Sequence, residues 1–280
     1  MNALEIKNLT KTYPDFKLNN LTLTLPQGCI MGLIGENGAG KSTTIKLILD
    51  MISKDSGSIT VLGRDNKASM CLTKEEIGVV MDEAGIPECL NVKQVGRVMK
   101  HIFKSWNGAE YNRLIKRLAL PCEKQFRDFS RGMKMKLCIA IALSHNSKLL
   151  ILDEATSGLD PVVRDEVLEM FEDFTRDENH SILISSHIVS DLEKLCDYIA
   201  FLHKGELMLC EEKDTLLAQY GLINCTADEI EKLPREAVKH KKINPYGAQA
   251  LVLRSMVPAD IIISPVSIEE LFVFMVKEAK

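Results

Sequence analysis

The fold of this chain is decided by the stretch CIMGLIGENGAGKST, residues 29–43. Its first six residues form a nearly unbroken apolar run of strand length, which is typical of a parallel strand covered by helices on both faces. The nine residues that follow fit the pattern G-x-x-x-x-G-K-[ST], and residues 44–50 continue as a segment rich in Ile and Leu, as a helix would. A strand, a glycine-rich loop and a helix in this order predict a site for phosphate groups.

The residue types in this loop suit that chemistry. Gly35, Gly38 and Gly40 let the backbone wrap closely around phosphates, and their amide hydrogens form a concave anion site with the helix N-terminus behind them. Lys41 can reach the β- and γ-phosphates, and the Ser42 hydroxyl suits Mg²⁺. An ordinary glycine-rich turn is the competing interpretation. The predicted nucleotide-binding residues are Gly35, Glu36, Asn37, Gly38, Ala39, Gly40, Lys41, Ser42 and Thr43.

A second apolar run, residues 149–152, ends in the two carboxylates Asp153 and Glu154. Parallel strands present their carboxyl ends at the same edge of a sheet, so these acids are expected near the phosphate loop. Asp153 is predicted to hold Mg²⁺ through water, and Glu154 to orient and deprotonate an attacking water. A solvated acidic turn is the competing interpretation.

The remaining patterns place the chain in the α/β class. Further apolar runs of strand length occur at 77–81, 181–185 and 198–202, with helical patterns between them, which predicts a mostly parallel sheet. Residues 21–25 alternate between Leu and Thr, as a strand with one buried face does. The predicted main domain covers residues 1–215, and a lobe of three helices interrupts it at about 91–146, beginning at the N-cap Asn91.

Residues 216–280 are expected to form a small α+β accessory domain. Short β-rich pieces are predicted at 250–253 and 261–263, followed by an amphipathic helix from Ile268.

Composition narrows the classes of function. Lys plus Arg is 35 and Asp plus Glu is 39, so the net charge of −4 argues against nucleic acid as a partner. No apolar stretch approaches the roughly 18–20 residues that cross a bilayer, and the first residues lack a secretion signal. The eight cysteines form no C-x-x-C pair, so we expect neither a zinc cage nor a disulfide framework, in a reduced cytoplasmic protein.

Three further motifs stand in an informative order: Phe129-Ser130-Arg131-Gly132-Met133, Ser157-Gly158-Leu159-Asp160 and Ser185-Ser186-His187. With the two motifs above, they resemble the ATP-binding subunit of ABC transporters over residues 3–215. The resemblance implies a P-loop NTPase fold with an antiparallel β subdomain and an inserted helical lobe. It also implies ATP and Mg²⁺ as ligands.

The resemblance assigns roles to particular residues. Ser130, Arg131, Gly132 and Met133 match the family signature, which contacts the γ-phosphate of ATP held by a second subunit, so the site is complete only in a head-to-tail dimer. The resemblance places Asp160 at the dimer interface, His187 beside the γ-phosphate and the catalytic glutamate, and Tyr13 against adenine. Without the resemblance, Ser130 is a helix cap, His187 is structural and Tyr13 belongs to the core.

One position departs from the family pattern. After residues 77–81 the family usually has a glutamine that contacts Mg²⁺, and here Asp82 and Glu83 stand instead. A carboxylate binds Mg²⁺ at least as well as an amide, so the role of metal ligand is kept. Either acid could align with the glutamine, and we choose Asp82, with Glu83 as the alternative.

The expected function is that of an ATPase subunit that drives export through a separate membrane permease. The chain would act as a homodimer on the inner face of the cell membrane, docking through a groove lined near residues 82–92. Three features resemble those of exporter-type subunits: Arg131 and Met133 in the signature, the absence of the usual glutamine after residues 77–81, and the sequence of the tail at 267–272. An importer subunit, or a soluble ABC ATPase that acts on ribosomes or DNA, is the alternative.

Overall fold

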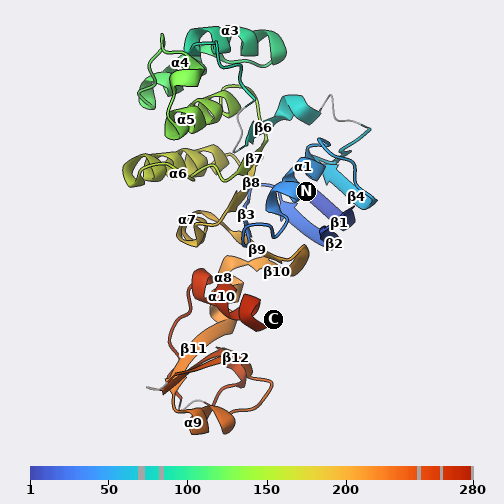
Figure 1. The fold of residues 1–280 in the computed structure, drawn as a ribbon, viewed down its shortest axis with the longest axis vertical. Helices are drawn as coiled ribbons and strands as arrows, with labels where there is room; N and C mark the ends of the chain where they lie inside the picture. The colour runs from blue at the N-terminus through green and yellow to red at the C-terminus, as the bar shows by residue number, and fades with distance from the viewer. Residues whose placement is uncertain (69–72, 82–84, 245–246, 259–260, 279–280) are drawn as a thin grey trace.

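The computed structural model describes residues 1–68, 73–81, 85–244, 247–258 and 261–278 (Figure 1). Within these residues, the central sheet has six strands in the order β10-β9-β3-β8-β7-β6. Its strands are β3 (Ile30–Ile34), β6 (Ile77–Val80), β7 (Leu149–Asp153), β8 (Ser181–Ser186), β9 (Tyr198–His203) and β10 (Glu206–Glu212). All neighbouring pairs are parallel except β9 and β10, as the prediction of a mostly parallel sheet requires. The apolar runs predicted as strands at 29–34, 77–81, 149–152, 181–185 and 198–202 correspond to β3, β6, β7, β8 and β9.

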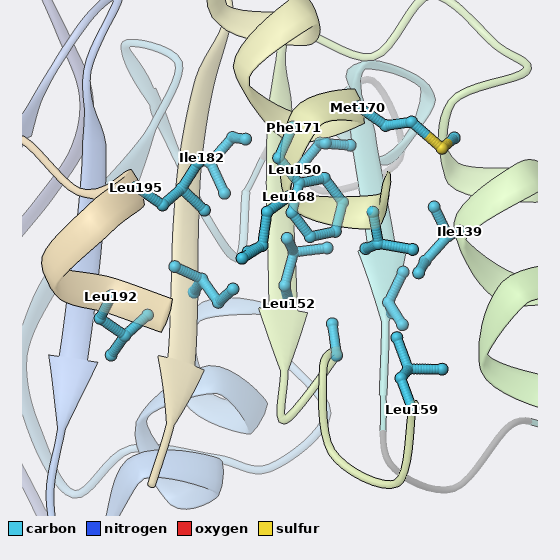
Figure 2. Close-up of a cluster of buried hydrophobic side chains, with 14 of the residues drawn as sticks. Ile139, Leu150, Leu152, Leu159, Leu168, Met170, Phe171, Ile182, Leu192 and Leu195 are labelled. Carbon is cyan, nitrogen blue, oxygen red and sulfur yellow. The ribbon is translucent and has the colours of Figure 1, made fainter. Parts of the chain in front are cut away.

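Both faces of the central sheet are covered. Leu150, Leu152 and Ile182 pack against α5 (Arg131–Ala142), α6 (Pro161–Thr175) and α7 (Val189–Leu195) on one face (Figure 2). Leu149 and Leu183 belong to the cluster on the opposite face, which includes α1 (Lys41–Ile48). Because side chains alternate along a strand, burial on both faces needs an unbroken apolar run, which is the pattern in the sequence.

A second, antiparallel sheet covers α1 from its other side. Its strands, in the order β2-β1-β4-β5, are β1 (Asn2–Tyr13), β2 (Phe16–Pro26), β4 (Ser56–Val61) and β5 (Arg64–Asp65). Leu21, Leu23 and Leu25 are buried, whereas Thr22 and Thr24 between them are exposed, as the alternation predicts. Ile45 and Ile48 of α1 share one apolar cluster with these leucines, so the helix that follows the phosphate loop is held between two sheets.

In the described residues that connect β6 to β7 along the chain, three α-helices extend away from the sheet (Figure 1). They are α3 (Val92–Ile102), α4 (Gly108–Arg117) and α5, with short 3₁₀ turns at Lys74–Glu76 before β6 and at Phe126–Asp128 before α5. Asn91 caps α3 and forms a reciprocal capping box with Gln94, as its position suggested. The buried Tyr111 of α4 donates its hydroxyl to the Val92 carbonyl at 2.9 Å, which ties the first two helices together.

The chain ends in α8 (Lys213–Gln219), β11 (Tyr220–Cys225), α9 (Ala227–Glu231), β12 (Val238–Asn244), β13 (Gly247–Leu253), a 3₁₀ turn at Arg254–Met256 and α10 (Ile268–Glu278). The three strands form an antiparallel sheet in the order β11-β13-β12. The prediction of a strand at residues 261–263 is wrong. Ile262 is 88% exposed, and among the described residues of this stretch pairing is limited to an isolated bridge between Leu222 and Ser264.

This C-terminal segment shares its core with the central sheet. Leu271 of α10 is fully buried in the cluster that includes Phe201 of β9, and the Phe201 and Phe272 rings lie 5.2 Å apart. The predicted boundary after Thr215 falls inside α8, and Leu216 on that helix belongs to the same cluster. None of the helices in the described part of the chain combines the length and the apolar character that a membrane span requires.

Candidate functional site

The register of the central sheet brings three motifs to one edge. Ser185 of β8 pairs with Leu33 of β3 on one side and with Asp153 of β7 on the other. The carboxyl ends of these three parallel strands are therefore level. The phosphate loop, the carboxylate pair and His187 follow directly from those ends, as the strand order requires.

The loop between β3 and α1 has a conformation that depends on glycine. Gly40, which caps α1, has a φ of 110°, and a Cβ on it would lie 2.9 Å from Cζ of Phe16. A Cβ on Gly35 would lie 2.5 Å from the Leu202 carbonyl oxygen of β9. The loop is thus fixed against two strands, and the buried Thr44 hydroxyl donates to the Gly40 carbonyl at 2.9 Å.

Lys41 is buried and its charge is compensated inside the site. Its Nζ donates to the Gly35 carbonyl at 2.7 Å and lies 3.6 Å from Oε1 of Glu154, with only 6% of the side chain exposed. A buried ammonium needs such an anionic neighbour, because desolvation strongly disfavours an unpaired charge. A bound phosphate would supply a second anion for the same cation.

The two carboxylates differ in their surroundings. Asp153 is 3% exposed and accepts a hydrogen bond from the Ser185 hydroxyl at 2.5 Å. Glu154 has a φ of 54°, a left-handed conformation that is uncommon outside glycine and clusters at functional sites. Its Oε2 lies 2.6 Å from Nδ1 of His187. Glu154 therefore lies between a cation and a histidine, an arrangement able to orient a water molecule and accept its proton.

These groups border a cavity of about 800 Å³. Among the residues that the structure describes, the lining of this cavity includes eleven that the sequence predicted as site residues: Glu36, Asn37, Gly38, Gly40, Lys41, Ser42, Thr43, Arg131, Asp153, Glu154 and His187. It also contains Asp15, Phe16 and Ser157, which sequence reasoning missed.

One aromatic residue lines the cavity beside the phosphate loop. Phe16 lines the cavity, whereas Tyr13 does not belong to that described lining and is 39% exposed. The two rings lie 6.5 Å apart across the β1–β2 turn. Both residues flank the turn between β1 and β2, so the sequence indicates an aromatic residue near this turn but does not decide which of the two lines the cavity.

The signature residues start a helix, and most of them lie outside the described lining of this cavity. Ser130 is exposed and caps α5, accepting a hydrogen bond from the Met133 amide at 3.2 Å. Arg131 does line the cavity, with Nη2 3.4 Å from the Ser157 hydroxyl. Asp160, also exposed, caps α6 by accepting from the Val163 amide at 3.1 Å. Ser130 and Asp160 thus each cap an exposed helix N-terminus, and the first residue of α5, Arg131, reaches the cavity.

The expected metal ligand Asp82, with its neighbour Glu83, lies outside the described residues. In the part of the chain that the structure covers, no group of three or more His, Cys, Asp or Glu side chains forms a metal site by itself.

Known proteins are similar to this chain in sequence and in fold. Residues 18–157 match the family described as ABC transporter. The lantibiotic transport ATP-binding protein SrtF of Streptococcus pyogenes is 37% identical over 215 residues, which are 75% of this chain and 91% of SrtF. YhcH of Bacillus subtilis, named as an uncharacterized ABC transporter ATP-binding protein, is 28% identical over 99% of this chain and 97% of its own.

A solved structure agrees with these relatives. The ATP-binding subunit of an ABC transporter superimposes with a TM-score of 0.70 and 28% sequence identity, over 78% of this chain and 92% of that subunit. The phosphate loop, the level strand ends and these relatives lead to one conclusion. The chain belongs to the ABC transporter family, as an ATP-binding subunit that hydrolyses ATP.

Proposed function

We propose that this chain binds MgATP in the cavity beside the phosphate loop and hydrolyses it there to power export by a separate membrane permease. The observation that carries the proposal is the position of Glu154. Its two oxygens face Lys41 at 3.6 Å and His187 at 2.6 Å, at the edge where the phosphate loop begins. A base beside a phosphate-binding cation is what attack by water on a terminal phosphate needs.

The roles of the individual residues follow from their chemistry. Loop amides and Lys41 bind the β- and γ-phosphates, and Phe16 or Tyr13 contacts adenine. Glu154 accepts the proton of the attacking water, and His187 holds that carboxylate in place through Nδ1. Asp153 and the exposed Ser42 supply the oxygen donors that Mg²⁺ prefers. Bound Mg²⁺ would neutralise phosphate charge, and Asp82 is proposed as a further ligand.

The active form is proposed to be a head-to-tail homodimer. Ser130 lies outside the described lining of its own cavity and caps the N-terminus of α5, whose first turn contains Arg131, Gly132 and Met133. Of these three, Arg131 lines that cavity and the other two lie outside its described lining. Such an end attracts an anion, and the γ-phosphate held by a second copy is the anion that the family resemblance supplies. Asp160, also exposed, is proposed to lie at the same interface.

The partner is proposed to be a membrane permease, which would place this chain on the inner face of the cell membrane. The similarity to a lantibiotic transport protein supports a cargo of the peptide-antibiotic class. No observation favours an importer, a ribosome or DNA. Residues 1–215 are proposed as the ATPase domain and residues 216–280 as an accessory domain.

The variant Glu154→Gln tests the proposal, because it keeps the shape of the side chain and removes the base. The full chain with this change is expected to bind ATP, form a stable dimer with it, and lose steady-state hydrolysis. Size-exclusion chromatography with and without MgATP measures the dimer, and phosphate release measures the rate. Hydrolysis at the parent rate would refute the role of Glu154.

A further inference from the structure

An ion pair between a partly exposed arginine and a buried carboxylate joins the two helices that follow the Asp160 and His187 loops. Nε of Arg164, in the first turn of α6, lies 3.8 Å from Oδ2 of Asp191 in α7. Asp191 is 5% exposed. Both atoms are buried, and neither has a hydrogen-bond partner among the described residues. Buried polar atoms without hydrogen bonds are costly, so a closer approach of these two groups would stabilise the contact.

Arg164 is attached to the loop that carries Asp160. Its Nη2 donates to the Leu159 carbonyl at 3.3 Å, and its backbone amide donates to the Asp160 carbonyl at 2.9 Å. A displacement of this loop therefore moves the guanidinium group with it.

Asp191 is attached in the same way to the segment that carries His187. Its amide donates to the Ile188 carbonyl at 3.3 Å, and the Ile188 amide donates to the Ser186 hydroxyl at 2.9 Å. His187 lies between these anchors and contacts Glu154. The pair thus connects the Asp160 loop to the histidine that holds the proposed base.

The distance between the two charged groups indicates what the connection does. At 3.8 Å the contact is an ion pair without a hydrogen bond, and an approach of about 1 Å would create a charge-assisted hydrogen bond. The same approach would satisfy both unpaired atoms. Formation of this bond is therefore favoured by any event that moves the Asp160 loop toward α7.

We propose that Arg164 and Asp191 are positioning residues that transmit the position of the Asp160 loop to His187, so that Glu154 is aligned when a second copy binds. This rests on the proposed function, because it presumes that His187 and Glu154 act in hydrolysis and that Asp160 lies at the dimer interface. The two residues touch no reacting group themselves, and their effect on the rate passes through His187.

A double-mutant cycle on the full chain tests this proposal. Arg164→Gln and Asp191→Asn are each expected to lower kcat about tenfold, with KM for ATP within about twofold of the parent value. The double variant should be no slower than the slower single variant, because both changes break the same connection. Arg164→Lys keeps the charge and should recover part of the rate.

A neighbouring ion pair provides the matched control. Glu166, two residues further along α6, lies 3.4 Å from Nε of Arg117 on α4, with both side chains about one-third exposed. The cycle Arg117→Gln and Glu166→Gln removes an ion pair from the same helix without touching the Asp160–His187 connection. The kcat of each variant in this control cycle is expected to stay within about twofold of the parent value.

Three results would overturn the proposal. The folded Arg164 and Asp191 variants could have the kcat of the parent, or the fold-losses in kcat of the two single variants could multiply in the double variant. The control variants at Arg117 and Glu166 could also lose as much kcat as the Arg164 and Asp191 variants. A pair that serves only stability would lower the midpoint of thermal unfolding and leave kcat unchanged. Glu154→Gln is run in parallel. If Glu154→Gln hydrolyses ATP at the parent rate, the proposed function fails. If Glu154→Gln is inactive but the Arg164 and Asp191 variants keep the kcat of the parent, only this inference fails.

Discussion

Nδ1 of His187 lies 2.6 Å from Oε2 of Glu154, although 33 residues separate them in the chain. Two local features create this contact. Glu154 leaves the end of β7 in a left-handed conformation, and His187 leaves the end of β8, the strand directly beside β7. The parallel register places both residues at one edge, and the left-handed turn directs the carboxylate toward the ring.

Replacing His187 with alanine is expected to slow hydrolysis more than it weakens binding. Without the ring, Glu154 keeps its contact with Lys41 but loses its orientation, so kcat should fall by about 10²-fold while KM changes little. Steady-state phosphate release over a range of ATP concentrations separates the two constants. His101→Ala, an exposed histidine on α3, is the control. An increase in KM with unchanged kcat would contradict this role.

Lys41→Ala is expected to weaken nucleotide binding. The variant removes the buried cation of the site, and a hydrogen bond to a charged group contributes about 1.5–3 kcal/mol, so Kd should rise at least tenfold. Isothermal titration calorimetry with ADP measures this without turnover. Lys46→Ala, an exposed lysine later in α1, should bind like the parent. Unchanged affinity in Lys41→Ala would reject the loop as the phosphate site.

The identity of the adenine contact is decided by comparing two aromatic variants. Because Phe16 lines the cavity, Phe16→Ala should raise Kd for ATP roughly tenfold, within the range measured for stacking of bases on aromatic rings. Tyr13→Ala should leave Kd unchanged. Phe16→Leu keeps an apolar group beside Gly40 and separates loss of stacking from loss of packing. A larger effect from Tyr13→Ala would instead identify Tyr13 as the adenine contact, as the family resemblance implies.

The sequence could predict those parts of the site that are placed by residues adjacent in the chain or by the ends of buried strands. The phosphate loop and Glu154 each adjoin a buried strand, so parallel strand order alone brings them together. It could not predict that Phe16 lines the cavity, because this depends on how one hairpin turn packs against Gly40. Nor could it predict the Arg164–Asp191 contact, since that depends on the packing of two helices.

The acid side of the stability profile is expected to depend on His145. Its ring stacks on Phe103 with centroids 4.0 Å apart, and burial lowers the pKa of the imidazole, an effect partly offset by the Glu75 carbonyl and charge. The unfolded chain therefore binds this proton more readily than the folded protein. The contribution to the free energy of unfolding is present above the ordinary histidine pKa of about 6.5 and is lost as pH falls through the lower folded pKa.

His145→Phe keeps the stacked ring and removes the titration. Urea unfolding followed by circular dichroism at several pH values should give a flatter profile for this variant than for the parent on the acid side of neutrality. Glu75 also has a lowered pKa, chiefly through the Ser105 amide, so some pH dependence will remain in both proteins. Parallel profiles would show that His145 does not control this range.

Leu271→Ala tests whether the C-terminal segment folds with the ATPase core. Leu271 is fully buried in the cluster that contains Phe201, so truncation should cost about 2–5 kcal/mol and lower the midpoint of thermal unfolding by several degrees. Since the core is shared, loss of ATP hydrolysis on heating should shift by the same amount. Val273→Ala, 41% exposed on the same helix, should change neither midpoint by more than about one degree. Two separate transitions, with ATPase inactivation unshifted in Leu271→Ala, would instead show that residues 216–280 unfold independently of the catalytic core.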